Sequence, residues 1–211
     1  MMNLSHIKAV VFDCDGVMFD TALANRKFYD EVLKNFNKPP LTEAQFLQVH
    51  MMTVGHAVSY LFPEVRDPAP VFRCLKQIGY RKFIRYMKMA DGLFELLTDL
   101  SSHGYVRAVA TNRTDTMGTV LRDYNLEDQF DMVVTAADVK HPKPHPEQLE
   151  KIMARFSLNP DQMLFIGDSV YDQQAARAAG TVFAAFRQTG LDADLHARAM
   201  QDISQALKIN E

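Results

Sequence analysis

Short apolar runs, each followed by a polar or amphipathic stretch, recur along much of this chain. The first run, at residues 7–12, is rich in β-branched side chains and ends at two aspartates and a glycine. Such a run is typical of a strand that is buried on both faces. The same pattern predicts further strands at residues 106–110, 132–135, 163–166 and 182–186.

Helical patterns lie between these predicted strands. Leu93, Leu96, Leu97 and Leu100 recur at helical spacing, and Gly104 follows as a stop signal. Apolar residues at 120, 121 and 124 and the segments 147–156 and 171–179 continue the series. Alternation of strand and helix predicts an α/β fold with a parallel sheet that helices cover on both faces.

The segment from residue 18 to residue 89 breaks this alternation, because it contains no convincing strand. Thr42 with Gln45 forms a capping-box pattern, and Pro70 can open a helix that runs to Met87 unless Gly79 interrupts it. We therefore predict an all-helical insertion at 18–89 within a core of residues 1–17 and 90–211. In the alternative interpretation, these helices simply cover the sheet.

Composition describes an ordinary folded chain of 211 residues, with 47% hydrophobic and 23% charged residues. A net charge of −3 gives no indication of a nucleic-acid surface, and no apolar run approaches the ~20 residues of a membrane span. We see no signal peptide, and the two cysteines match no metal or disulfide framework, so we expect reduced thiols and a cytoplasmic protein. The basic cluster Arg81, Lys82, Arg85 and Lys88 suits either a solvated helix face or a surface that attracts an anionic substrate.

Four polar stretches carry the chemistry, and three of them directly follow predicted strands. The stretches are Asp13-Cys14-Asp15-Gly16, Thr111-Asn112, Lys143 between two prolines, and Gly167-Asp168-Ser169 with Asp172. The carboxyl ends of parallel strands meet at one edge of a sheet, where ligands bind in open α/β folds. We therefore expect the four stretches to converge in one crevice.

Asp13 and Asp15 suit phosphoryl transfer. One carboxylate can attack phosphorus, and its partner can protonate the leaving oxygen and later act as base for water. Asp168 with Asp13 can supply hard oxygen ligands for Mg²⁺, while Asp172 can orient waters or Lys143. Each acid also has a structural alternative: a turn of solvated acids for Asp13 and Asp15, and a helix start for Asp168, Ser169 and Asp172.

The remaining polar stretches suit a phosphate. Thr111 and Asn112, placed just before a predicted helix, can hold phosphate oxygens, although a simple turn with a cap explains them as well. Lys143 can neutralise the nucleophile and the transferring group, or it can be a surface lysine. His141 and His145 flank Lys143, but the intervening prolines preclude a regular helix, so we expect both to be loop residues or to support the site residues without touching the ligand.

Taken together, the stretches resemble the motifs of the haloacid dehalogenase-like hydrolase superfamily, in its phosphatase branch with a helical cap. The resemblance spans essentially the whole chain and implies a five-stranded Rossmann-like core with the first strand central. It further implies that Asp13 is the nucleophile and Asp15 the general acid/base. Asp13, Asp168 and the backbone carbonyl of Asp15 would hold Mg²⁺. Phosphate would be bound by Thr111, Asn112 and Lys143, with Gly16, Ser169 and Asp172 in support.

Within the superfamily, the chain resembles the phosphoglycolate phosphatase-like and β-phosphoglucomutase-like proteins. Asn25 stands where such a mutase has a histidine, and His56 and Ala57 follow Gly55 where mutases favour an arginine. Asp15 argues against a dehalogenase or phosphonatase. The resemblance thus implies a Mg²⁺-dependent phosphatase for a small phosphorylated metabolite, acting as monomer or homodimer. A phosphosugar mutase and a non-catalytic binding protein are the alternatives, and Asn25, His56 and Arg81 are candidate specificity residues.

Overall fold

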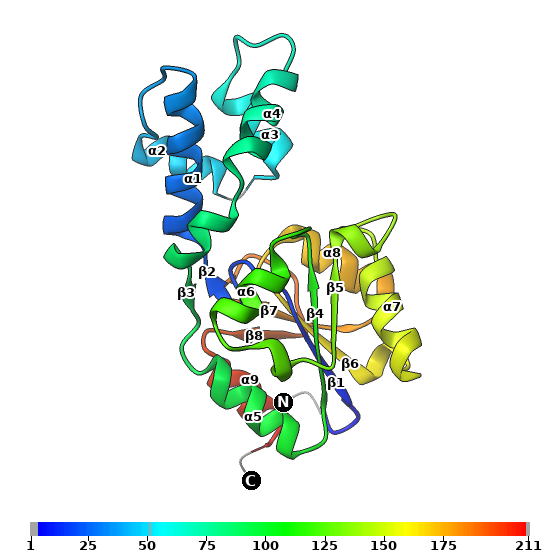
Figure 1. Ribbon diagram of the computed structural model, residues 1–211. Helices are drawn as coiled ribbons and strands as arrows, with labels where there is room; N and C mark the ends of the chain where they lie inside the picture. Colours follow the sequence, from blue (N-terminus) through cyan, green and yellow to red (C-terminus); the bar gives the residue numbers. More distant parts are fainter. Residues whose placement is uncertain (1–3, 51, 210–211) are drawn as a thin grey trace. The chain divides into compact units, whose positions relative to one another are not determined.

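Six parallel strands form the main sheet of the computed structural model, which describes residues 4–50 and 52–209 (Figure 1). Their order across the sheet is β5-β4-β1-β6-β7-β8. The strands are β1 (Ala9–Phe12), β4 (Val106–Thr111), β5 (Met132–Thr135), β6 (Met163–Gly167), β7 (Val182–Phe186) and β8 (Leu195–Ala197). The α/β class and the parallel sheet are confirmed, but the expected strand number of five is wrong. The sixth strand, β8, is a three-residue edge strand without the apolar run that marks the others.

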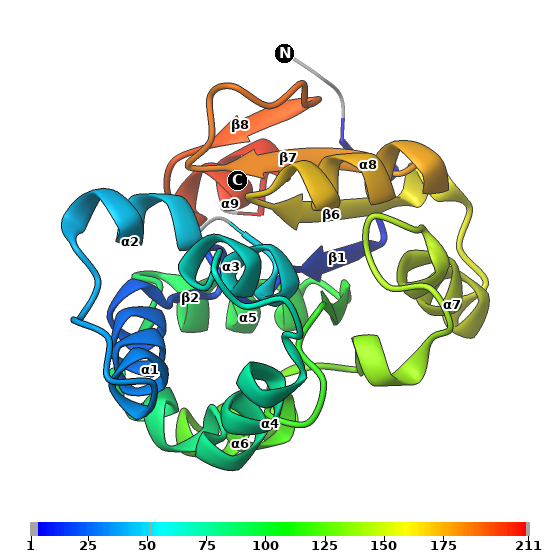
Figure 2. The ribbon, with the colours of Figure 1, turned by 90° about the horizontal axis from the view of Figure 1, so that it is seen from above.

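The first strand lies inside the sheet, as the resemblance implied. It pairs with β4 on one side and β6 on the other, and all four of its residues are fully buried. Figure 2 shows β8, β7, β6 and β1 following one another across the sheet. Burial on both faces explains why the strand is a continuous apolar run rather than an alternating one.

Helices cover the two faces of this sheet. On one face, α5 (Leu93–Ser102) packs against α9 (Met200–Ala206) and β4; on the other, α7 (Glu147–Phe156) and α8 (Val170–Ala179) contact each other and the strands (Figure 1). Two shorter elements connect β4 to β5, and two 3₁₀ turns flank α7: α6 (Met117–Asp123), η2 (Glu127–Gln129), η3 (Ala136–Asp138) and η4 (Pro160–Gln162). None of the helices in the described part of the chain combines the length and apolar character that a membrane span requires.

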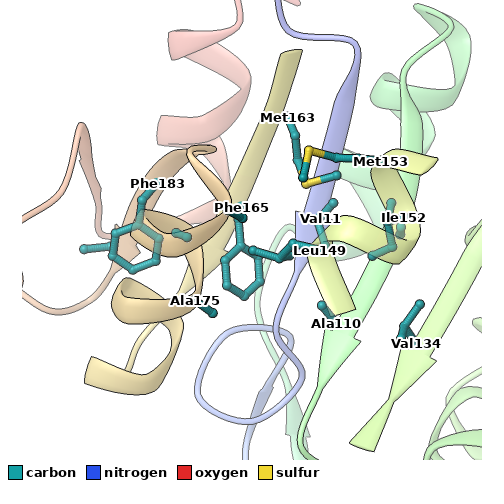
Figure 3. Packing of buried hydrophobic residues seen from close by; sticks show 14 residues of the cluster. Val11, Ala110, Val134, Leu149, Ile152, Met153, Met163, Phe165, Ala175 and Phe183 are labelled. Carbon is teal, nitrogen blue, oxygen red and sulfur yellow. The ribbon is translucent and has the colours of Figure 1, made fainter. Parts of the chain in front are cut away.

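The core beneath α7 and α8 is a continuous apolar cluster (Figure 3). Val11 and Phe165 enter it from the strands, while Leu149 and Ile152 enter from α7 and Ala175 from α8. Burial of this surface fixes the strands in register. The ends of the strands therefore form a rigid platform for the polar residues that follow them.

The chain divides into two units. The first comprises Met1–Asp20 and Met89–Glu211 and contains the main sheet; the second is Thr21–Lys88. The apolar pattern predicts these transitions after residues 17 and 89. The role of the second unit as a cap stays a prediction.

The described residues of the second unit form helices joined by loops, and Lys88 at its end belongs to a short strand, so the prediction of an all-helical segment at 18–89 is wrong at its two ends. Its elements are α1 (Ala22–Asn35), α2 (Glu43–Val49), α3 (Val54–Leu61), α4 (Ala69–Ile78) and the 3₁₀ helix η1 (Arg81–Tyr86). The capping box of Thr42 and Gln45 opens α2 as predicted. The single long helix from Pro70 to Met87 does not form, because Gly79 adopts φ +64° and ends α4. Two short strands, β2 (Phe19–Asp20) and β3 (Lys88–Met89), pair where the chain leaves and re-enters the first unit.

Candidate active site

The parallel register of three strands brings the predicted polar stretches to one edge of the sheet. Phe12, the last residue of β1, pairs with Val109 of β4 and with Ile166 of β6. Asp13 follows and donates its backbone N–H to the carbonyl of Ile166 at 2.9 Å. Asp13 therefore lies level with the residues that end β4 and β6, as expected for a site at the carboxyl edge of a parallel sheet.

The ammonium group of Lys143 connects two carboxylates at this edge. Its Nζ donates to Asp13 Oδ1 at 2.7 Å, to Asp172 Oδ1 at 2.6 Å and to the carbonyl oxygen of Ala110 at 2.9 Å. Lys143 is only 5% exposed, and three acceptors satisfy the three donors of its buried ammonium. Asn112 Nδ2 donates to the Lys143 carbonyl at 3.0 Å and so ties the lysine loop to the end of β4. The structure thus excludes the surface-lysine alternative.

Burial and neighbouring charge set the protonation of this pair. Burial alone would lower the pKa of Lys143, but the charges of Asp13 and Asp172 outweigh it and raise that pKa above its ordinary value. Burial also raises the pKa of Asp13, and Asp172 and Asp15 add to the rise while Lys143 opposes it. Lys143 is therefore the group that counteracts the cost of an ionised carboxylate at position 13.

Asp168 is a second acid whose pKa is raised. Burial, together with the charges of Asp13 and Asp172, raises the pKa of Asp168 to about 8. One carboxylate oxygen from each of these three acids lies within 4.8 Å of the other two. A group of desolvated acids at this spacing could hold a divalent cation, which would relieve their mutual repulsion.

Asp13 and Asp168 fit the ligand role better than Asp172 does. Asp172 Oδ1 accepts from Lys143, and its Oδ2 accepts from the backbone N–H of Ser169 at 3.0 Å and from the Ser169 hydroxyl. Within residues 4–50 and 52–209, no hydrogen bond reaches the Asp168 carboxylate or Oδ2 of Asp13. Those oxygens remain available for a cation, whereas Asp172 holds Lys143 and opens α8 in a capping box with Ser169.

Two glycines leave room for the acids. Gly16 has φ +80°, and a Cβ at this position would lie 1.8 Å from Asp168 Oδ2. A Cβ at Gly167 would lie 2.3 Å from the Cβ of Asp172. Both contacts are impossible for a real side chain, so glycine at these two positions is what allows the acids to approach the backbone.

Thr111 is the last residue of β4 and Asn112 follows it directly, but the helix after them begins later than predicted. Thr111 is 1% exposed, and its hydroxyl accepts from the backbone N–H of Arg113 at 3.2 Å. The helix α6 starts only at Met117, because residues 112–116 form a loop that this turn begins. A phosphate at this position would therefore meet loop N–H groups rather than the N-terminus of α6.

Comparison with known families identifies the chain. A sequence model described as haloacid dehalogenase-like hydrolase matches residues 10–186. The chain belongs to this family. This result confirms the sequence-based identification and shows that the protein is a hydrolase.

Relatives of this hydrolase carry phosphatase names. Pyrophosphatase PpaX from Bacillus mycoides is 27% identical over 83% of this chain and 81% of that protein. Phosphoglycolate phosphatase from Salmonella paratyphi A is 27% identical over 85% of this chain and 81% of that protein. These names are consistent with phosphoester hydrolysis, the enzyme class that the sequence predicted.

Solved structures agree with the fold. A HAD-superfamily hydrolase of subfamily IA, variant 1, from Geobacter sulfurreducens is 36% identical, with a TM-score of 0.85 over 96% of this chain and 97% of that one. The β-phosphoglucomutase from Clostridium difficile has a TM-score of 0.78 over 96% of this chain and 97% of its own at 18% identity. The second likeness shows a shared fold only.

Sequence reasoning missed Arg113 at the site of this hydrolase. Its Nε and Nη2 donate to Oδ2 and Oδ1 of Asp15 at 2.8 and 2.7 Å, a bidentate ion pair. The two aspartates predicted to work together thus have different cations, Lys143 for Asp13 and Arg113 for Asp15. The available signal was the position of an arginine directly after Thr111-Asn112.

Gln148 is a second residue that the sequence analysis did not single out. It is fully buried on α7, and its Nε2 donates to the carbonyl oxygen of Thr111 at 2.7 Å. This bond links α7 to the end of β4. The helical pattern at 147–156 gave no sign of the contact, because a buried glutamine in an apolar stripe can serve many partners.

The predicted specificity residues belong to the second unit. The Asn25 amide is engaged there, since Oδ1 accepts from Tyr80 Oη at 2.5 Å and Nδ2 lies 3.2 Å from His50 Nδ1. His56 and Arg81 are exposed. Their contribution to substrate choice stays a prediction.

The His141 and His145 rings contact each other in the lysine loop, with centroids 4.9 Å apart and ring planes tilted by 42°. Glu147 accepts the backbone N–H groups of Lys140 and His141, each at 2.9 Å. These contacts brace the loop that carries Lys143.

Proposed function

We propose that this hydrolase is a Mg²⁺-dependent phosphatase that acts on a small phosphorylated metabolite through an aspartyl-phosphate at Asp13. The observation that carries the proposal is the 2.7 Å contact between Lys143 Nζ and Asp13, with Asp168 in the same group of acids. A preorganised buried ammonium stabilises a charged nucleophile and the oxygens of a transferring phosphoryl group. The phosphatase names of the relatives support the same chemistry.

The reaction has two steps. In the first, a carboxylate oxygen of Asp13 forms a bond to phosphorus, the bond from phosphorus to the leaving oxygen breaks, and Asp15 transfers its proton to that oxygen. In the second, water attacks the phosphorus, its proton passes to Asp15, and the bond from Asp13 to phosphorus breaks. Inorganic phosphate leaves, and both acids return to their starting states.

The remaining polar residues bind and orient the phosphoryl group. Lys143 neutralises its charge, and Thr111 and Asn112 offer a hydroxyl, an amide and loop N–H groups to its oxygens. Asp13, Asp168 and the backbone carbonyl of Asp15 would hold Mg²⁺, which supplies Lewis-acid stabilisation of the phosphoryl oxygens when bound. Gly16, Ser169 and Asp172 support these residues through the close approaches and hydrogen bonds described above.

The proposed substrate class is a small phosphorylated metabolite. Pyrophosphate and phosphoglycolate, the substrates in the relatives' names, both fit this class. We further propose that the second unit is a cap over the site, with Asn25, His56 and Arg81 contributing to specificity. A cytoplasmic monomer or homodimer is the expected form.

The direct test is hydrolysis of p-nitrophenyl phosphate, pyrophosphate and phosphoglycolate with Mg²⁺ and with chelator. We expect Mg²⁺-dependent release of phosphate that Asp13→Asn abolishes, while the exposed-site control Asp161→Asn retains the wild-type rate. Mass spectrometry of protein quenched during turnover should show one added phosphoryl group on Asp13. Equal rates in wild type and Asp13→Asn would refute the proposal.

The same assay separates the phosphatase from a mutase. A phosphatase transfers the phosphoryl group to water and needs no activator. Transfer to sugar phosphate that exceeds transfer to water and depends on a sugar bisphosphate would favour the mutase instead.

A further inference from the structure

The bidentate contact between Arg113 and Asp15 has no part in the chemistry assigned so far. The Arg113 side chain is 7% exposed and that of Asp15 is 39% exposed. Two parallel N–H···O bonds fix both the distance and the plane of a carboxyl group, which a single contact to an ammonium does not. Arg113 therefore restricts how the Asp15 carboxyl group can rotate.

Arg113 is itself held along its whole length. Its backbone N–H donates to Thr111 Oγ1 at 3.2 Å, its carbonyl accepts from Ala136 N–H at 2.9 Å, and its Nη1 donates to Thr116 Oγ1 at 3.2 Å. These partners lie at or near the ends of β4 and β5. The guanidinium therefore holds the Asp15 carboxylate at a fixed position relative to this edge of the sheet.

Asp15 is anchored from its own side by the turn after β1. Gly16 N–H donates to the Phe19 carbonyl at 2.8 Å, and Phe19 N–H donates to the Cys14 carbonyl at 3.0 Å. Within residues 4–50 and 52–209, Arg113 is the single cation that forms an ion pair with Asp15, because the three Lys143 donors point to other acceptors. Each Asp15 oxygen accepts one bond from Arg113, so a second lone pair on each stays available for a proton.

We propose that Arg113 is a positioning residue that aims the Asp15 carboxyl group at the leaving oxygen of the substrate. The inference rests on the proposed function and adds a residue to it. Proton transfer from Asp15 must coincide with cleavage of the bond from phosphorus to oxygen, so it depends on the placement of the carboxyl group. The rate should depend strongly on this placement when the leaving oxygen is basic, and weakly when the leaving oxygen departs without a proton.

Leaving-group dependence is therefore the test. Release of the phenol in the first turnover is measured for phenyl phosphate and 2,4-dinitrophenyl phosphate, which differ in leaving group but not in the transferred phosphoryl group. For Arg113→Met we expect a loss of ~10²-fold with phenyl phosphate, the low end of the range for general acid catalysis, and under about 10-fold with 2,4-dinitrophenyl phosphate. Arg113→Lys keeps the positive charge but loses the two parallel hydrogen bonds of the guanidinium. Its rate loss should also be larger with phenyl phosphate than with 2,4-dinitrophenyl phosphate, but by a smaller factor than in Arg113→Met.

The chain offers a matched control on β4, the strand that precedes Arg113. Arg107 forms a similar pair with Asp131, through Nε at 3.4 Å and Nη2 at 3.2 Å, at the opposite end of β4. Arg107→Met should leave the ratio of the two rates unchanged. In an Asp15→Asn background, Arg113→Met should have little further effect, because the group that it positions is already gone.

The possible outcomes are distinct. Equal losses on both substrates for Arg113→Met, or full recovery of the ratio in Arg113→Lys, would overturn the positioning role while leaving the phosphatase assignment intact. Absence of Mg²⁺-dependent turnover in the wild type would overturn both. If Arg113→Met does not fold, Arg113→Lys carries the test, and an unchanged ratio in that variant refutes the inference.

Discussion

Lys143 Nζ lies 2.6 Å from Asp172 Oδ1, so the acid that opens α8 also holds the ammonium that neutralises Asp13. The other oxygen of Asp172 is engaged by Ser169. One carboxylate therefore fixes both the start of α8 and the buried ammonium of Lys143. Of the three neighbouring acids, Asp172 is thus engaged by Lys143 and Ser169, whereas Asp13 and Asp168 keep oxygens that could bind a cation.

Asp172→Asn should impair turnover and stability more than it impairs metal binding. An asparagine side chain has one accepting oxygen, whereas both oxygens of Asp172 accept hydrogen bonds. The NH₂ group of the asparagine would therefore face a donor of either Lys143 or Ser169. A hydrogen bond to a charged group contributes about 1.5–3 kcal/mol, and we expect a loss of that order in the free energy of unfolding. Mg²⁺ affinity can be measured from the rise in unfolding temperature as Mg²⁺ is added. Asp172→Asn should lose less Mg²⁺ affinity than Asp168→Asn, and the reverse order would contradict the assignment of Asp168 as the metal ligand.

Removal of the ammonium should destabilise the protein strongly. Lys143→Met leaves two buried carboxylates without their cation, and breaking a buried pair in this way typically costs about 3–5 kcal/mol. Urea unfolding measures this loss, and turnover should disappear in the same variant. Lys140→Met, an exposed change three positions earlier in the same loop, is the control and should unfold as the wild type does.

Gly16→Ala should disrupt the acidic group without a change of charge. The added methyl would overlap Asp168 Oδ2, and alanine at φ +80° costs roughly 1–2 kcal/mol of backbone strain. We expect loss of Mg²⁺-dependent turnover and weaker Mg²⁺ binding by calorimetry. Gly118→Ala on α6 meets no atom within 4 Å and should keep full activity, with a gain in stability of up to about 1 kcal/mol. Full activity in Gly16→Ala would show that turnover does not require the Asp168 carboxylate in its observed position.

The stability of the metal-free protein should fall as pH rises through the neutral range. Burial and the charges of Asp13 and Asp172 raise the pKa of Asp168 to about 8, whereas an unfolded aspartate titrates near ~3.9. Between these values the folded state keeps a proton that the unfolded state releases, so the free energy of unfolding declines as pH increases. Asp168→Asn cannot titrate and should decline less across this window. Urea unfolding in chelator at several pH values compares the two proteins, and parallel curves would contradict the prediction.

The strands of the core could be predicted from sequence because buried parallel strands leave continuous apolar runs. Residues 132–135 and 182–186 coincide with β5 and β7. The edge strand β8 was missed, since it has three residues and one exposed side chain. The break at Gly79 was noted as a possibility, and the positive φ of that glycine decides it.

The convergence of Asp13, Lys143, Asp168 and Asp172 followed from their places after strands and in one loop. Contacts that depend on the direction of a side chain could not be predicted from the sequence. The pairing of Arg113 with Asp15 joins positions 98 residues apart, and an arginine directly after Thr111-Asn112 has several possible partners. The late start of α6 was also missed, because the turn at Thr111 competes locally with helix formation.

The paired strands β2 and β3 have a consequence for how this protein can change over evolution. The chain leaves the main-sheet unit after one of them and returns through the other, and they are hydrogen-bonded neighbours. Both ends of the inserted segment thus lie about one strand spacing apart, roughly 5 Å. Any insert with equally close ends can be exchanged at this junction without disturbing the strand order beside it, so the segment between β2 and β3 can diverge while the main sheet is inherited unchanged.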